Sequence, residues 1–365
     1  MKRGVHIDRP LAFLLALLVA GGALMFASAA FGLLARGATH MTSVAFNHLV
    51  LGVGLGLVGL LITTRIEYRI WRRFAPHLFV LACIATAAVF IPHIGFEHGG
   101  GRRWLSIAGF TFQPAETLKI GAVILAAAYF SLIKDRIGQI RYGLLGLFAI
   151  LAVPVGLLIM QPDLGTLGIV VISTIAVYFA AGAPWRDILI IILGGIIALG
   201  ILAYMRPYVM DRVTVFLNPS HAPQAEGYQI KQALIAIGSG GIFGRGLGQG
   251  VQKFTYLPEP MGDSIFAVLG EELGFVGASG LVIVFLLFAL RGYAVATRTQ
   301  DLFGGLLAIG ISTYLGAEAF VNIAAMLGLA PLTGIPLTFI SQGGSAMLVS
   351  LASAGILLNI SRRSS

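Results

Sequence analysis

Acidic residues next to a proline-rich turn are the first candidates for chemistry in this sequence. Residues 256–274 read YLPEPMGDSIFAVLGEELG, so Asp263 stands at the start of a long apolar stretch and Glu271 and Glu272 lie inside it. An ionised carboxylate is costly in hydrocarbon, and acidic residues in such a stretch therefore indicate a functional site by default. The alternative is that Asp263 caps the N-terminus of a helix, a role that aspartate fills well.

A second set of polar residues falls near the same side of the predicted bundle. Its members are Arg102, Arg103, Gln113, Glu116, Lys119 and Asp163. Around one cavity, the cations would bind an anionic headgroup, best a diphosphate, to which arginine offers two parallel N–H groups. A carboxylate beside them could take a proton from a hydroxyl nucleophile or hold a divalent cation such as Mg or Mn. The alternative is that these charges only neutralise one another inside a packed membrane protein.

Two further patterns leave alternatives open. The glycine-rich run GSGGIFGRGLGQG (residues 238–250) loosely resembles a phosphate-binding loop, but no Lys-Ser/Thr follows it and no strand is expected before it. We interpret it as a flexible re-entrant turn. Glu318 and Asn322 are spaced to share one helix face and to hydrogen-bond within the bundle. A proton or ion path through Glu271, Glu272 and Glu318 is the alternative.

The composition determines what kind of protein must position these residues. Of 365 residues, 58% are hydrophobic and 11% are charged, and the mean hydropathy is +0.93. Soluble proteins carry about twice that share of charge, so the sequence predicts an all-α polytopic membrane protein. Apolar runs of spanning length, at about 20 residues each, predict ten transmembrane helices. They fall at about 10–34, 44–63, 76–94, 116–133, 142–160, 164–181, 187–205, 264–290, 302–328 and 334–358.

The net charge of +9 is a topology signal and does not require a nucleic-acid partner. With the N-terminus in the cytoplasm, fifteen of the 24 basic residues fall in cytoplasmic segments, and an excess of lysine and arginine marks that side. We therefore expect both termini in the cytoplasm, with clusters such as RIEYRIWRRFA contacting anionic membrane lipids. The long loop between the seventh and eighth helices, about 206–263, then lies outside. Its residues 228–238 fit a short amphipathic helix on the membrane surface.

Five motifs follow one another along the chain. They are GGRRWLSIAGFTFQPAETLK, QPDLGT, FLNP with the later GYQIKQAL, VQKFTYLPEPMGDSIFAVLGEELGFVGA, and PLTGIPLTFISQGGSAMLVSLASAGILLNISRR. In this order they resemble the SEDS family (shape, elongation, division and sporulation), whose members are ten-helix peptidoglycan glycosyltransferases. The resemblance extends over nearly the whole chain, which we expect to form one membrane domain, 1–365. The FLNP, VQKFTYLPE and LLNISR stretches are closer to the division-type FtsW and SpoVE branch than to RodA.

The resemblance implies polymerisation of lipid II into glycan strands on the outer face of the bacterial cytoplasmic membrane, in cell division, with release of undecaprenyl diphosphate. It implies that Asp263 is the essential loop aspartate, which acts as general base or holds a divalent cation, and that no organic cofactor is needed. The substrate-binding residues it implies are Arg102, Arg103, Gln113, Glu116, Lys119, Asp163, Tyr228, Gln232, Lys253, Ser341 and Ser345. The chain departs from the family pattern at Met261, Gly262 and Gln342.

Partners follow from what the recognised motifs lack. They contain no transpeptidase, so the resemblance implies a class B penicillin-binding protein as partner, together with other divisome or elongasome proteins. A lipid II flippase, which an inverted repeat and broken helices at mid-membrane would favour, and a non-catalytic division scaffold stay open as alternatives. Mutation distinguishes them: polymerisation should need Asp263, flipping should depend more on Glu271, Glu272 or Glu318, and scaffolding should survive either change.

Overall fold

The apolar runs of the chain form helices, because a helix satisfies its own backbone polar groups, as a hydrocarbon environment demands. The computed structural model describes residues 7–35, 46–98, 101–107, 110–218 and 226–363. Within these ranges eight helices are long and apolar enough to cross a membrane, and two shorter apolar helices of 17 residues each bring the number to ten. The predicted all-α polytopic membrane fold is thereby confirmed.

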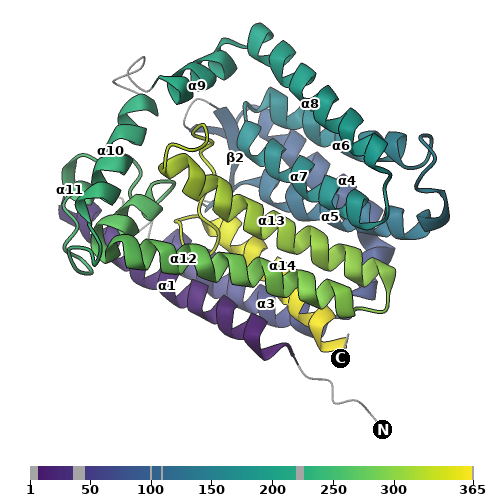
Figure 1. Ribbon diagram of the computed structural model, residues 1–365, viewed down its shortest axis with the longest axis horizontal. Coiled ribbons are helices and arrows are strands. Elements are labelled where there is room, and N and C mark those ends of the chain that lie inside the picture. Colours follow the sequence, from purple (N-terminus) through teal and green to yellow (C-terminus); the bar gives the residue numbers. More distant parts are fainter. Residues whose placement is uncertain (1–6, 36–45, 99–100, 108–109, 219–225, 364–365) are drawn as a thin grey trace.

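Ten apolar segments make up the helical bundle (Figure 1). They are α1 (Arg9–Ala35), the π-helical η1 (Asn47–Gly54) continuing as α3 (Leu55–Arg65), α4 (Arg69–Ala87) with the short η2 (Ala88–Phe90), α5 (Pro114–Leu132), α6 (Leu144–Met160), α7 (Leu164–Ala180), α8 (Trp185–Met205), α12 (Ile265–Arg298), α13 (Leu302–Met326) and α14 (Gly344–Arg363). Most of the apolar stretch is buried in α5, α13 and α14, at 67%, 72% and 78%, whereas none of it is buried in α8. The centre of the bundle is therefore built from α5, α13 and α14.

Three helices differ from their predicted bounds, and one of them is α12, which was predicted at 264–290 and continues to Arg298. The third predicted span, 76–94, is α4, which begins at Arg69 because its arginines lie along the first turns, where long side chains reach polar surroundings. The tenth, predicted at 334–358, begins only at Gly344. Pro331 and Pro336 lack the N–H that a helix needs, so the residues before α14 form an irregular loop.

A small antiparallel sheet lies between α4 and α5, and the sequence analysis did not anticipate it. Its strands are β1 (Gly95–His98), β2 (Gly101–Ile107) and β3 (Phe110–Phe112), in that spatial order. Phe96 pairs with Trp104 and Leu105 pairs with Phe112. The alternation along β2 is confined to a few residues, with Leu105 buried and Ser106 exposed, which is too short a pattern to predict a strand amid glycines.

The long loop between α8 and α12 contains helices of its own. It contains α9 (Pro207–Leu217), α10 (Glu226–Ser239) and α11 (Gln252–Thr255). The predicted amphipathic helix is α10, which buries Ile230, Ala233 and Ala236 and exposes Lys231. The loop then leads into α12, which is broken at Gly274 by a backbone φ of 65°. Its first part, 265–273, is therefore a separate short rod.

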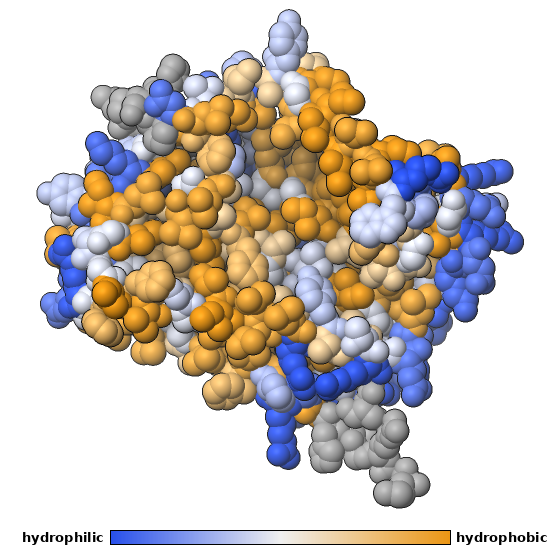
Figure 2. Space-filling view, viewed as in Figure 1, coloured by the Kyte–Doolittle hydropathy of each residue, from blue (hydrophilic) through white to orange (hydrophobic). Residues whose placement is uncertain are grey.

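The two ends of the bundle differ. The start of α1 and the end of α14 lie at the same end, away from α10 and α11 (Figure 1). At that end Arg291 pairs with Asp8 at 2.8 Å and Arg363 pairs with Glu67 at 3.3 Å. Figure 2 shows hydrophilic side chains toward the ends of the helices and apolar side chains over the face between them, as a protein that spans a membrane requires.

Candidate functional site

Asp263 lies in a tight turn between α11 and α12. Gly262 and Ser264 donate their N–H groups to the Glu259 carbonyl at 3.0 and 3.2 Å, and Asn322 of α13 donates Nδ2 to the Asp263 carbonyl at 3.0 Å. The backbone of Asp263 is thus fixed. Its carboxylate has no hydrogen bond or ion pair with any residue that the structure describes, and the side chain is partly accessible. A fixed backbone with an unengaged carboxylate is an arrangement suited to contact with a substrate.

Charges around Asp263 adjust its proton affinity. Burial and the neighbouring Glu259 carboxylate raise the pKa of Asp263 to about 6, although Arg103 and Arg212 act in the opposite direction. A carboxyl group with a pKa near 6 is ionised at neutral pH and is still basic enough to accept a proton. The side chain therefore has the protonation behaviour of a general base.

Arg103, Gln113 and Asp163 meet where β2, α5 and α7 begin or end. Asp163 caps α7, accepting the Thr166 N–H at 3.1 Å through Oδ1, and Oδ2 accepts Gln113 Nε2 at 3.2 Å. Arg103 donates Nε to the Gln161 carbonyl at 3.2 Å and Nη2 to the next carbonyl along the chain. Arg103 and Asp163 both influence the charge of Asp263, so these predicted residues share one region with it.

Glu116 and Lys119 are brought together, but in a closed cluster. Lys119 of α5 lies 2.9 Å from Glu116 and 2.8 Å from Glu318 of α13, and each of the three side chains is at most 2% exposed. The Tyr314 ring lies 5.2 Å from the ammonium. Two carboxylates thus share one cation inside the bundle. This matches the alternative reading of mutual neutralisation.

Ser341 and Ser345 hold other parts of the site in place. Ser341 donates its hydroxyl to the Gly262 carbonyl at 2.7 Å, and Gln342 donates its backbone N–H to the Met261 carbonyl at 2.7 Å. Ser345 accepts the N–H of Gln113 at 3.2 Å. Both serines are buried. The loop before α14 is therefore hydrogen-bonded to the turn that carries Asp263. These bonds involve Met261, Gly262 and Gln342, the positions where the chain departs from the family pattern.

The other predicted site residues lie farther out or elsewhere. Arg102 is exposed on β2 and faces Glu97 at 3.6 Å. Tyr228 and Gln232 are half-buried on α10, whose Gln229 donates to the Ser264 hydroxyl at 3.0 Å.

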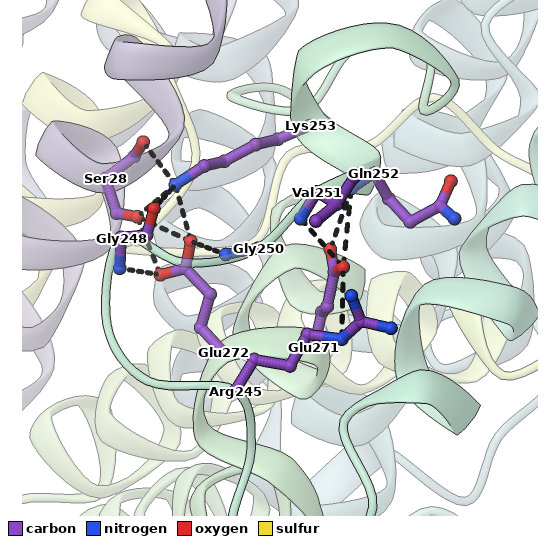
Figure 3. A network of polar contacts seen from close by, with 9 residues as sticks. All are labelled: Ser28, Arg245, Gly248, Gly250, Val251, Gln252, Lys253, Glu271 and Glu272. Atoms are coloured by element: carbon purple, nitrogen blue, oxygen red, sulfur yellow. Dashed lines mark hydrogen bonds and ion pairs between the residues drawn. The ribbon is translucent and has the colours of Figure 1, made fainter.

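Lys253 does not join the group around Asp263, contrary to the expectation of substrate contact. Its side chain is fully buried, and its ammonium lies 2.6 Å from Glu272 Oε1 (Figure 3). Oxygen atoms of the protein surround the Lys253 ammonium, so this group is not available to contact a substrate.

Two charged residues near Asp263 were missed by sequence reasoning. Arg212 lies on α9 and Glu259 lies between two prolines in the turn, and both influence the charge of Asp263. The available signal was their place in the long loop between α8 and α12, next to the acidic stretch. It was weak, because only the folded loop brings Arg212 of α9 close enough to influence the charge of Asp263.

The described residues do not by themselves form a protein metal cage. They contain no group of three or more His, Cys, Asp or Glu side chains placed to hold a metal ion. Among the carboxylates around Asp263, Glu259 has the largest influence on the pKa of Asp263. Because Mg²⁺ commonly uses only one or two carboxylates together with substrate phosphates, the divalent cation at Asp263 stays a prediction.

Similarity to known proteins extends over nearly the whole chain. The FtsW/RodA/SpoVE family model, described as cell cycle protein, matches residues 9–365. The "Probable peptidoglycan glycosyltransferase FtsW" of Trichlorobacter lovleyi is 42% identical over 311 residues, which cover 84% of this chain and 81% of the relative. Stage V sporulation protein E of Bacillus subtilis is 36% identical over 315 residues, which cover 86% of each protein.

Solved structures share the fold. A chain from a peptidoglycan synthase complex that coordinates polymerization and crosslinking superposes with a TM-score of 0.78 at 27% identity, covering 98% of both chains. The rod shape-determining protein RodA of Thermus thermophilus superposes with a TM-score of 0.70 at 28% identity, covering 98% of this chain and 97% of the other.

Proposed function

The chain belongs to the SEDS family, the FtsW/RodA/SpoVE cell cycle proteins, and we propose that it is a peptidoglycan glycosyltransferase that polymerises lipid II during cell division. Relatives up to 42% identical that carry the name of this activity support the proposal. Within the structure, the observation that carries it is the Asp263 carboxylate, which is unengaged, has its pKa raised to about 6 and stands near two arginines.

In the proposed reaction Asp263 acts as the general base. It accepts the proton of the acceptor sugar hydroxyl, whose oxygen attacks the anomeric carbon of the donor. The bond from that carbon to the diphosphate breaks, and its electron pair leaves with undecaprenyl diphosphate. Direct attack inverts the configuration at the anomeric carbon.

Cationic groups complete the chemistry. A diphosphate leaves as a stable anion and needs no protonating acid, so one base and nearby positive charge suffice. Arg103 and Arg212 are the arginines that act on the charge of Asp263, and we assign to them the stabilisation of the diphosphate. Gln113 and Asp163 hold the site together beside Arg103 through their own hydrogen bond at 3.2 Å.

The site belongs on the outer face of the bacterial cytoplasmic membrane. Both ends of the sequence carry basic residues, and the start of α1 and the end of α14 lie at the opposite end of the bundle from α10 and α11 (Figure 1). Because an excess of lysine and arginine marks the cytoplasmic side, both termini are cytoplasmic and the turn with Asp263 faces outward.

A class B penicillin-binding protein is the proposed partner. The relative solved as part of a synthase complex that coordinates polymerization and crosslinking supports such a partner, because glycan strands need a transpeptidase to be crosslinked. Co-purification of the tagged chain with a class B penicillin-binding protein from the same cell tests the pairing. An unrelated tagged membrane protein of similar size serves as the control for non-specific co-purification.

A polymerisation assay on the purified protein tests the activity. Lipid II is supplied in detergent, with and without the partner, and glycan polymer is measured for the wild type, Asp263→Asn and the control Asp135→Asn. Asp135 is an exposed aspartate at the other end of the bundle. Polymer from the wild type and the control, with a loss of about 10³-fold or more in folded Asp263→Asn, is the expected result.

Other outcomes decide between the alternatives. Equal polymer from wild type and Asp263→Asn would show that Asp263 is not the base. No polymer from any form, with partner and Mg²⁺ present, would favour the flippase or scaffold, and lipid II translocation into vesicles would then be measured. Activity that is lost in EDTA and restored by Mg²⁺ or Mn²⁺ would support the predicted cation. Activity unchanged in EDTA would contradict that prediction alone.

A further inference from the structure

Lys253 is the centre of a buried polar network apart from the candidate site (Figure 3). Its ammonium is fully enclosed and lies 2.6 Å from Glu272 Oε1. It donates to the Ser28 hydroxyl at 2.9 Å, to the Ser28 carbonyl at 3.0 Å and to the Gly248 carbonyl at 3.1 Å. Three parts of the chain, α1, the glycine-rich run and α12, therefore meet at one charged group.

The two glutamates of α12 hold the backbone of the glycine-rich run. Gly248 donates its N–H to Glu272 Oε2 at 3.0 Å, Val251 donates to Glu271 Oε1 at 2.8 Å and Gln252 donates to Glu271 Oε2 at 3.1 Å. Surface loops usually leave such N–H groups to water, whereas here buried carboxylates take that place. Charge-assisted hydrogen bonds are roughly twice as strong as neutral ones, so residues 248–252 are confined to one path.

Glycines make this close approach possible. A Cβ on Gly250 would lie 3.0 Å from carboxylate oxygens of both Glu271 and Glu272, and one on Gly244 would lie 2.1 Å from the Glu272 carbonyl. A Cβ on Gly274, where α12 breaks, would lie 2.3 Å from the Gly244 nitrogen. Backbone N–H groups of the run donate to the carbonyls of both glutamates. The run is thus fitted to the break in α12 and is not a phosphate loop.

The network reaches Asp263 from both directions along the chain. Residues 254–262 lead from Lys253 to Asp263 and are packed by the buried Leu257 and Met261. After Asp263, the first part of α12 runs to the glutamates. Nine helical residues extend about 13 Å, so this rod carries Asp263 at one end and Glu272 at the other. The loop that delivers Asp263 is therefore tied to both ends of the rod.

We propose that Lys253, Glu271 and Glu272 are positioning residues, which fix the loop that carries Asp263 so that its carboxylate meets the acceptor hydroxyl. This role rests on the proposed function, because it requires Asp263 as the base. The Lys253 ammonium is enclosed by protein oxygens and does not touch the substrate. A misplacement of a catalytic group by about 1 Å costs about a hundredfold in rate, whereas headgroup binding elsewhere is left intact. The effect therefore belongs in kcat, with KM for lipid II nearly unchanged.

Steady-state polymerisation by a set of variants tests this role. Lys253→Met, Glu272→Gln and the double variant are compared with Lys134→Met, a matched change at an exposed lysine. Each single variant should lower kcat about a hundredfold with KM within about twofold. The double variant, which leaves no unpaired buried charge, should recover about tenfold relative to the single variants. Ser28→Ala removes one hydroxyl but keeps the ion pair, and should lower kcat about three- to tenfold.

The outcomes separate this role from the proposed function. If the wild type makes no polymer, the proposed function fails. If the wild type polymerises, Asp263→Asn does not, and folded Lys253→Met matches Lys134→Met, the base stands and the positioning role is overturned. A rise in KM with unchanged kcat would also overturn it, since that result points to substrate binding by Lys253. If the Lys253 variants fail to fold, Ser28→Ala decides the question. A kcat of Ser28→Ala equal to that of the wild type would contradict the positioning role.

Discussion

The acid limb of the pH–rate profile should belong to Asp263. A general base works when it is deprotonated, so activity falls as pH drops through its pKa, which is raised to about 6. About 90% of the group is ionised at pH 7 and about 10% at pH 5, so kcat/KM should fall about tenfold over those two units. An ordinary aspartate, with a pKa near 4, would lose almost nothing in that range.

Two neighbours should move this limb in opposite directions. Glu259 raises the pKa of Asp263, so Glu259→Gln should shift the limb to lower pH; Arg212 lowers that pKa, so Arg212→Gln should shift it to higher pH. At an effective dielectric constant of about 20, a charge close enough to influence another group contributes on the order of 1 kcal/mol. Each shift should therefore be about half a pH unit to one unit.

The assay is kcat/KM for lipid II polymerisation between pH 4.5 and 8, in buffers of constant ionic strength. The ratio is used because its pH dependence reports the free enzyme. Folding of each variant is checked at both extremes by size-exclusion chromatography. If both variants shift the limb in the same direction, or if neither shifts it by more than about 0.2 unit, the titrating group is not Asp263 and the reasoning is wrong.

Two predictions concern stability. Lys119→Met should destabilise the protein by about 3–5 kcal/mol, because it leaves two buried carboxylates without their cation. Glu318→Gln should cost much less stability, since the ion pair between Lys119 and Glu116 remains. Unfolding in SDS–detergent mixtures measures both losses, and equal losses would contradict the charge argument. Gly274→Ala should lower the melting temperature in detergent, because its φ is 65° and a Cβ would meet backbone 2.3 Å away, while Gly280→Ala on the same helix, with open space around it, should not. Equal melting temperatures for the two glycine variants would show that the break in α12 is not needed.

Much of the bundle follows from one-dimensional information. Length and hydropathy predicted ten apolar helices, and the motifs predicted the family that the relatives confirm. The predicted start of α14 was wrong, because the run contains Pro336 and the helix begins only after the irregular loop that follows it. The sheet β1–β2–β3 was missed, because seven residues of β2 carry too little periodicity.

The residues of the candidate site also differ in how far the sequence alone could predict them. Asp263 could be singled out from its place before an apolar run, because a carboxylate there is costly whatever the fold. Its neighbours could not be ranked in this way. Lys253 and Arg212 are both cations of the loop between α8 and α12, yet the structure encloses Lys253 with Glu272 and places Arg212 near Asp263.

The sequence by itself determined that this protein crosses a membrane many times and which family it resembles, and it singled out the aspartate that we predict at the centre of its chemistry. These follow from the cost of burying polar groups and from contiguous motifs, which need no knowledge of distant contacts. Only the tertiary structure decided which charges face the aspartate, which neutralise one another in the bundle, and that Glu271 and Glu272 hold the glycine-rich run. Those outcomes depend on side chains far apart in the chain, such as Ser28 and Glu272, that come within hydrogen-bonding distance only after the helices pack.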